Sequence, residues 1–147
     1  MKRSLAFSLV ILLAILSHSN FIFSQGFNSV FSPDGNLVIA VGNNGNFFKS
    51  LNGGNNYGSY PKGSANLNSV FGIKSKVWIA GSSGSIMVSS NSAVDFNSYT
   101  YTANNLRSVY FVNENTGWVV GENGTIGKTV NGGVNWTAQT SPVNVNL

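Results

Sequence analysis

Between residues 27 and 140, apolar and polar side chains alternate in short runs that end in clusters of glycine, asparagine and serine. A period of two is typical of β-strands with one buried face, and the intervening clusters favour tight hairpin turns, because glycine and asparagine tolerate positive φ angles. In the last third of the chain the pattern predicts four strands, at about residues 107–112, 117–121, 125–130 and 135–140. No convincing helical stripe appears beyond the N-terminal segment.

This strand pattern occurs three times. The segments that begin at Phe27, Leu67 and Leu106 read FNSVF, LNSVF and LRSVYF. Three landmarks keep intervals of 39 or 40 residues: Ser29, Ser69 and Ser108; Gly42, Gly81 and Gly121; Asn52, Asn91 and Asn131. Four antiparallel strands in about 40 residues are typical of a β-propeller blade. The sequence therefore predicts an all-β fold of three four-stranded antiparallel blades, an incomplete or open propeller, at about residues 27–66, 67–105 and 106–146.

The strands are rich in aromatic and β-branched residues at corresponding positions. Ile39, Trp78 and Trp118 share one position of the second strand, and each first strand carries a valine with an aromatic residue after it. We expect these side chains to pack one blade against the next rather than to stack on a ligand.

The N-terminal 25 residues have the order of a secretory signal peptide. Lys2 and Arg3 precede an apolar run, which is followed by small and polar residues up to Gln25. The run is shorter than the roughly 20 residues that a bilayer span needs. We expect cleavage near Ser24 or Gln25, with Ser17 and Ser19 as a competing site, and a secreted or periplasmic protein without a membrane span in its mature chain.

Removal of that segment changes the composition. The mature chain keeps six lysines and arginines against four aspartates and glutamates, a net charge of +2, and the basic residues are scattered. Nucleic-acid binding needs clustered positive charge, so we expect none. The chain has no cysteine, and its one histidine, His18, leaves with the signal peptide, so we expect no disulfide, no metal site and no cofactor.

The segment GTIGKT, residues 124–129, resembles a phosphate-binding loop. That loop requires a glycine five residues before the final glycine and a helix after it, but position 122 is Glu122. The other two repeats place Phe48 and Met87 where this copy has Gly127. The segment is therefore predicted to form a hairpin and not a nucleotide site.

The turn before the last strand fits the Asp-box pattern S/T-x-D-x-G-x-x-W, with asparagine in place of aspartate. In this turn the amide oxygen accepts backbone N–H bonds, the glycine makes the bend and the aromatic ring tucks beneath. The second copy is degenerate, with alanine at the glycine position. The predicted structural residues are Ser50, Asn52, Gly54 and Tyr57; Ser89, Asn91 and Phe96; and Thr129, Asn131, Gly133 and Trp136.

With these motifs the chain resembles the photosystem II stability/assembly-factor family, and it is also similar to the Asp-box blades of sortilin-type propellers and of some glycoside hydrolases. The resemblance covers residues 27 to about 140 and implies a propeller blade. Family members are thought to bind membrane-protein partners through basic surfaces, whereas the mature chain here has a single arginine, Arg107. We expect an exported, non-catalytic scaffold that binds a protein or a glycan.

The alternative is a fragment of a carbohydrate-active propeller, glycoside hydrolase or sialidase-like, whose catalytic residues lie outside this chain. Arg107 alone cannot form the arginine cluster of a sialidase. The four carboxylates, Asp34, Asp95, Glu114 and Glu122, all fall in predicted turns, so we predict no catalytic residue among them. Because closed propellers have about 4–8 blades, three arrangements stay open: a fragment of a longer propeller, a homo-oligomer that completes the ring, or a short open arc.

Overall fold

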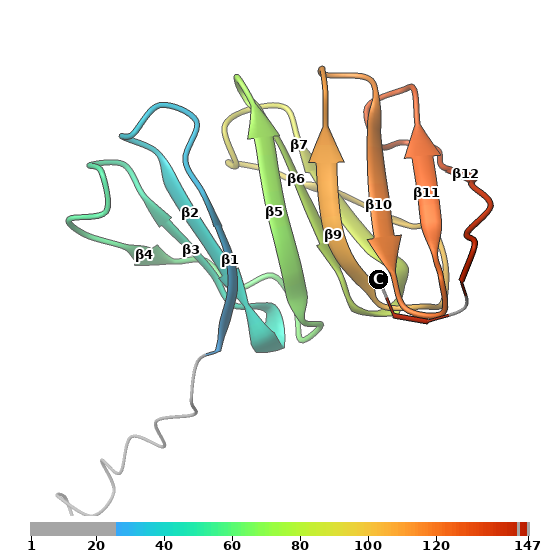
Figure 1. The fold of residues 1–147 in the computed structure, drawn as a ribbon. Helices are drawn as coiled ribbons and strands as arrows, with labels where there is room; N and C mark the ends of the chain where they lie inside the picture. Colours follow the sequence, from blue (N-terminus) through green and yellow to red (C-terminus); the bar gives the residue numbers. More distant parts are fainter. Residues whose placement is uncertain (1–25, 144, 147) are drawn as a thin grey trace, which may run out of the picture.

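The computed structural model describes residues 26–143, 145 and 146, which form three four-stranded antiparallel sheets in chain order (Figure 1). The first sheet comprises β1 (Phe27–Phe31), β2 (Val38–Gly42), β3 (Phe47–Ser50) and β4 (Gly58–Ser59). The second comprises β5 (Leu67–Ile73), β6 (Lys76–Gly81), β7 (Ser85–Ser89) and β8 (Asn97–Thr100). The third comprises β9 (Leu106–Phe111), β10 (Gly117–Gly121), β11 (Ile126–Thr129) and β12 (Thr137–Ala138).

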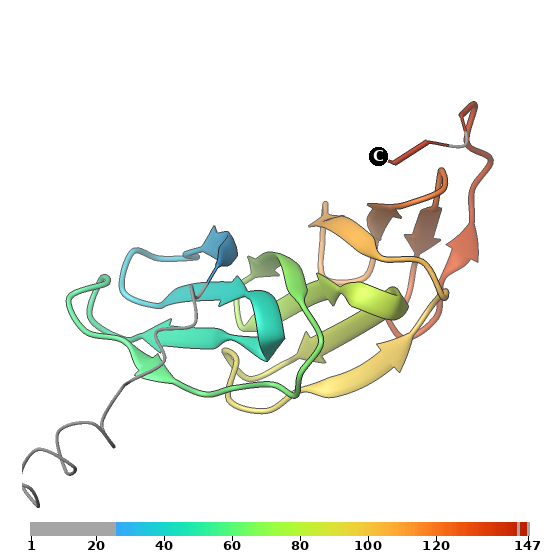
Figure 2. The ribbon, with the colours of Figure 1, turned by 90° about the horizontal axis from the view of Figure 1, so that it is seen from below.

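Each sheet is a meander in which strands that follow one another in the sequence are paired. Seen from below, the sheets stand beside one another, with β1, β5 and β9 along one side of the array (Figure 2). These first strands contact each other from blade to blade. The predicted fold class, all-β with three four-stranded antiparallel blades, is confirmed. The predicted signal peptide, residues 1–25, lies outside the described residues.

Two hydrophobic cores lie between the sheets. Ile39, Val41 and Phe47 of the first sheet pack against side chains of the second, among them Leu67 and Val70. The opposite face of the second sheet packs against the third in the same way, through a core composed of Trp78, Ala80, Ile86, Leu106, Val109, Phe111 and Val119. A fully buried side chain of this size contributes about 1.5–3 kcal/mol. Each blade is therefore stabilised mainly by its neighbours.

A β-bulge lies near the start of every first strand. Phe27 pairs with Gly42 and Ser29 with Val41, which leaves Asn28 as the extra residue. Asn68 and Arg107 occupy the same place in the other two sheets. A bulge redirects a side chain out of the ladder. Accordingly, the Asn28 amide donates to the Leu67 carbonyl at 2.9 Å, and the Asn68 amide donates to the Leu106 carbonyl at 2.7 Å.

The repeated glycines Gly42, Gly81 and Gly121 allow a close backbone approach. A Cβ atom at any of them would collide with the carbonyl oxygen of the residue that precedes the first strand of the same blade. This packing explains why the three positions lack a side chain.

The turn between the second and third strands is a single 3₁₀ turn in two of the sheets, η1 (Asn43–Gly45) and η2 (Ser82–Gly84). Each includes a residue with positive φ, Asn44 at 55° and Ser83 at 53°, so these are hairpin connections. Among the residues that the structure describes, no helix has the length and apolar character to cross a bilayer.

The last strand of the third sheet is shorter than predicted. Pairing with β11 covers Thr137 and Ala138, whereas the sequence pattern predicts residues 135–140. The N–H of Asn135 is donated to the Asn131 side chain, and the Trp136 indole donates to the Gly133 carbonyl. Both residues therefore belong to the preceding turn, and the ladder begins only after them.

Candidate functional site

The three Asp-box-like turns share one hydrogen-bond network. In the third blade the hydroxyl of Thr129 donates to Asn131 Oδ1 at 3.0 Å and accepts the N–H of Gly133 at 3.0 Å. Asn131 Oδ1 also accepts the N–H of Asn135 at 2.9 Å. Ser50 with Asn52, and Ser89 with Asn91, make the corresponding bonds. Since the bonds common to the three turns use an acceptor oxygen of the side chain, asparagine serves in place of aspartate.

The glycine position of these turns has left-handed backbone geometry. Gly54 and Gly133 have φ values of +90° and +91°, and Ala93 takes φ +59° at the same place in the second blade. Ser50, Ser89 and Thr129 are each 1% exposed, and their hydroxyls make the hydrogen bonds given above, so these atoms are not available to a ligand.

The aromatic residues of the turns lie at the blade junctions. Phe96 packs edge-on against Phe47 of the first blade, with ring centroids 5.5 Å apart. Trp136 packs against Phe111 of its own sheet and against Tyr101 of the second blade. Tyr57 lies with its ring beside Gly54 of its own turn, as expected, but the residue is 47% exposed. The other two rings are covered by a preceding blade, and no blade precedes the first one among the described residues.

The segment GTIGKT belongs to a hairpin. Gly127, Lys128 and Thr129 lie in β11, which is paired with β10, and no helix begins there. The Lys128 ammonium lies 5.5 Å from the centre of the Trp118 ring. The lysine therefore contacts an aromatic face on its own sheet.

Each of the four carboxylates has partners of its own. Asp34 accepts the N–H groups of Asn36 and Leu37, and the Leu37 hydrogen bond is the main reason that the Asp34 pKa lies below its ordinary value. Asp95 accepts a bond from the Asn91 amide at 3.2 Å.

The two glutamates also have lowered pKa values. The hydrogen bond from Lys74, 2.9 Å away, lowers the Glu114 pKa, and the Asn105 hydrogen bond lowers that of Glu122. A glycosidase acid needs a raised pKa instead.

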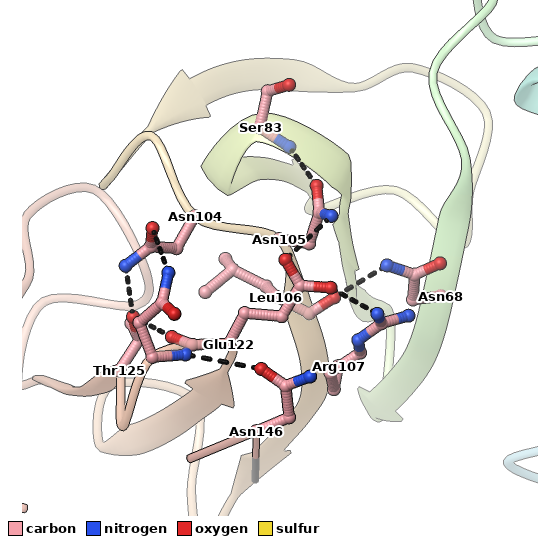
Figure 3. A network of polar contacts seen from close by, with 10 residues as sticks. Asn68, Ser83, Asn104, Asn105, Leu106, Arg107, Glu122, Thr125 and Asn146 are labelled. Carbon is pink, nitrogen blue, oxygen red and sulfur yellow. Dashed lines mark hydrogen bonds and ion pairs between the residues drawn. The ribbon is translucent and has the colours of Figure 1, made fainter. Parts of the chain in front are cut away.

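A polar network joins the second and third blades at the start of β9 (Figure 3). The Glu122 carboxylate accepts hydrogen bonds from Asn105 at 2.9 Å and from Arg107, and Asn105 Oδ1 accepts the N–H of Ser83 at 2.9 Å. Asn104 donates to Thr125 Oγ1 at 2.8 Å. Arg107, the residue weighed for substrate carboxylate binding, is thus committed to an ion pair with Glu122.

An open groove of about 700 Å³ lies at the other end of these blades. The lining includes Ile73 at the end of β5 and Lys74 in the turn after it, residues 112–116 of the turn from β9 to β10, and Val130. Val112 is 55% exposed and Val130 is 70% exposed. The Lys74–Glu114 ion pair belongs to the groove lining, and Lys76 donates to the Glu114 carbonyl at 3.1 Å. The groove therefore combines two exposed apolar side chains with both signs of charge.

Sequence reasoning missed this groove. The available signal was that Lys74 and Glu114 fall in the same connection of adjacent repeats, so that their turns must lie side by side in a propeller. For the described residues there is no group of three histidine, cysteine, aspartate or glutamate side chains that could hold a metal ion.

Comparisons with known proteins agree with this geometry. Residues 61–130 match the family model described as photosynthesis system II assembly factor YCF48. No functionally curated protein matches the chain significantly in sequence. The chain is similar in structure to YCF48 bound to a D1 peptide, with a TM-score of 0.75 and 16% identity over 82% of this chain.

YCF48 from Cyanidioschyzon merolae gives a TM-score of 0.70 and 17% identity over 81% of this chain, and an ancestral GH74 enzyme gives 0.67 and 23% over 79%. The matched parts amount to 41% of each YCF48 chain and 18% of the GH74 enzyme. The β-propeller fold and the resemblance to the photosystem II assembly-factor-like repeat family are confirmed.

Proposed function

Starting from this likeness to the photosystem II assembly-factor-like repeat family, we propose that the chain is an exported, non-catalytic propeller-repeat module that binds a protein partner. The observation that carries the proposal is the groove between the turns of the second and third blades. Its apolar side chains, Val112 and Val130, are exposed beside the Lys74–Glu114 pair. Binding sites for extended peptides combine apolar anchors with a few polar groups in this way.

The ion pairs and hydrogen bonds of the carboxylates support a role without catalysis. Glu114 and Glu122 are paired with cations, and Asp34 caps a turn. A peptide partner is further supported by the structural likeness to YCF48, which has been described bound to a D1 peptide.

The direct test is peptide binding by the purified chain, measured by fluorescence anisotropy. The probes are a labelled D1 peptide and labelled peptides selected from a random display library. We expect Val130→Glu to weaken binding by at least about tenfold, or 1.4 kcal/mol, because it places a charge in the groove. The matched control is Leu51→Glu, since Leu51 occupies the same position in the first blade, is 73% exposed and lies outside the groove.

Equal binding by both variants would refute a peptide site in this groove. A display selection against the chain that yields no binding peptide, together with no binding of the D1 peptide, would refute it as well. A panel of polysaccharides tested in parallel separates glycan binding from peptide binding, and release of reducing sugar would contradict a non-catalytic role. Export is tested by the mass of the chain recovered from the periplasm or the medium. A new N-terminus near Gln25 is expected, and an intact Met1 would contradict it.

A further inference from the structure

The outer face of the first sheet carries an exposed apolar surface. Phe27, Val30, Ala40, Phe48 and Tyr57 line a hollow there of about 420 Å³. Phe27 is 55% exposed, Val30 67% and Tyr57 47%. We call these five residues the leading face.

The corresponding positions of the other two blades are buried by a neighbouring blade. Leu67 and Val70, which match Phe27 and Val30, are 1% and 5% exposed. Leu106 and Val109 are 0% and 4% exposed. The leading face is therefore one half of a blade junction, with the same residue types at the same register positions.

The outer face of the third sheet corresponds to the other half of a blade junction. Trp118, Val120 and Ile126 lie there, half-buried. We call these three residues the trailing face. The matching residues of the first blade, Ile39, Val41 and Phe47, are at most 1% exposed, and those of the second, Trp78, Ala80 and Ile86, are 0% exposed. In both cases a following blade covers them.

The polar contacts of the two existing junctions also repeat. Ser29 Oγ accepts the N–H of Val70 at 3.2 Å, and Ser69 Oγ accepts the N–H of Val109 at 3.2 Å. The next serine in this series is Ser108, and it is exposed. Its counterpart across a third junction would be the N–H of Val30.

The long side chains at these junctions donate to backbone carbonyls in the Asp-box-like turn of the next blade. Lys49 donates to the Ala93 carbonyl at 3.3 Å, and Trp78 donates to the Gly132 carbonyl at 2.8 Å. Lys128 and Trp118 hold the same positions in the third blade. The matching acceptors in the first blade are the carbonyls of Gly54 and Gly53. The third blade therefore carries donors for which the first blade has acceptors.

We propose that the trailing face of one chain packs on the leading face of a second copy, and that two copies close a six-bladed ring. The three described blades of two copies make six, a number within the range of about 4–8 blades found in closed propellers. The contact is head-to-tail, and two such contacts, related by a two-fold axis, bury all four outer faces. The inference does not depend on the proposed peptide groove, because Val112 and Val130 lie in neither face.

The test is sedimentation equilibrium of the full chain across the micromolar concentration range, with folding followed by circular dichroism. The mass expected for the associated species is twice that of one chain, which is 15.6 kDa for residues 1–147 and correspondingly less once residues 1–25 have been removed. Val30→Arg and Trp118→Ala should each raise the dissociation constant at least about tenfold, or 1.4 kcal/mol. Val94→Arg, at a valine of the second blade that is 59% exposed and lies outside both faces, should not raise the dissociation constant.

Mixing the two variants distinguishes a head-to-tail contact from a symmetric one. In the mixture the trailing face of the Val30→Arg chain meets the leading face of the Trp118→Ala chain, so one intact junction forms and association is partly restored. A monomeric unmodified chain would overturn the proposal, whether its faces are covered by another protein or by further blades. So would a dimer that is insensitive to Trp118→Ala, because that result indicates two leading faces in contact.

Discussion

Replacement of Trp78 is the most informative perturbation of the packing between blades. Its side chain is 0% exposed and stacks on Phe111, with ring centroids 3.7 Å apart and an interplanar angle of 12°. Its indole N–H donates to the Gly132 carbonyl at 2.8 Å. One side chain of the second blade thus contacts the core and the Asp-box-like turn of the third.

The magnitude follows from these contacts. Removal of a buried tryptophan side chain costs about 3–5 kcal/mol, and loss of the hydrogen bond adds about 1 kcal/mol. We therefore expect Trp78→Ala to lower the free energy of unfolding by about 4–6 kcal/mol. Trp78→Phe keeps most of the ring but leaves the Gly132 carbonyl unpaired, for which we expect about 1–3 kcal/mol.

The assay is urea unfolding followed by far-UV circular dichroism, which does not depend on tryptophan fluorescence. Leu51→Ala, at a position that is 73% exposed, is the control and should change stability by less than about 0.5 kcal/mol. A loss below about 1 kcal/mol for Trp78→Ala would refute the reasoning, because that is the size of an ordinary substitution.

Three further predictions concern the turns and the carboxylates. Gly84→Ala should lower the free energy of unfolding by about 2–3 kcal/mol, because Gly84 has a φ of +68° and a Cβ there would collide with the carbonyl oxygen of Thr102. Gly35→Ala is the control and should lower it by less, because Gly35 has a φ of +82° but no atom within 4 Å of a Cβ. Both are measured by urea unfolding. Asn131→Asp should raise the free energy of unfolding at pH 7 by about 1 kcal/mol, and with it the thermal midpoint, because a charged oxygen accepts the same hydrogen bonds more strongly. An unchanged or lower midpoint would contradict this role of Oδ1. The pKa values of Asp34 and Glu114 in the folded chain lie below their ordinary values of 3.8 and 4.5. The two carboxylates therefore contribute their full stabilisation above those ordinary values, and this contribution is lost as the pH falls through the lowered pKa values of the folded chain. A thermal midpoint that does not fall between pH 5 and pH 2 would contradict this.

Much of the fold was predictable because the same pattern of apolar and polar residues occurs in all three repeats. Ile39, Trp78 and Trp118 share a register position, and period-two alternation places them on one face of their strands. The first two are buried between blades as predicted. Trp118 is half-buried, because its exposure depends on a neighbour that an alternating pattern does not specify.

Other features depended on contacts far apart in the sequence. Asn28 and Asn68 look like ordinary polar residues of a first strand, yet a bulge turns them toward the next blade. The groove with Lys74 and Glu114 required knowing that turns 40 residues apart lie side by side. The exposure of Tyr57 follows from its place in the first blade rather than from its motif.

The central claim is that the chain repeats one blade, each copy packed on the next by the same contacts. Nuclear Overhauser measurements on the isotope-labelled chain test it most directly. The account predicts cross-peaks from the Val70 amide proton to the Ser29 β-protons and from the Val109 amide proton to the Ser69 β-protons, together with one from the Trp78 indole proton to the α-protons of Gly133. Their absence in a folded chain, or cross-peaks that join the sheets in a different register, would contradict it.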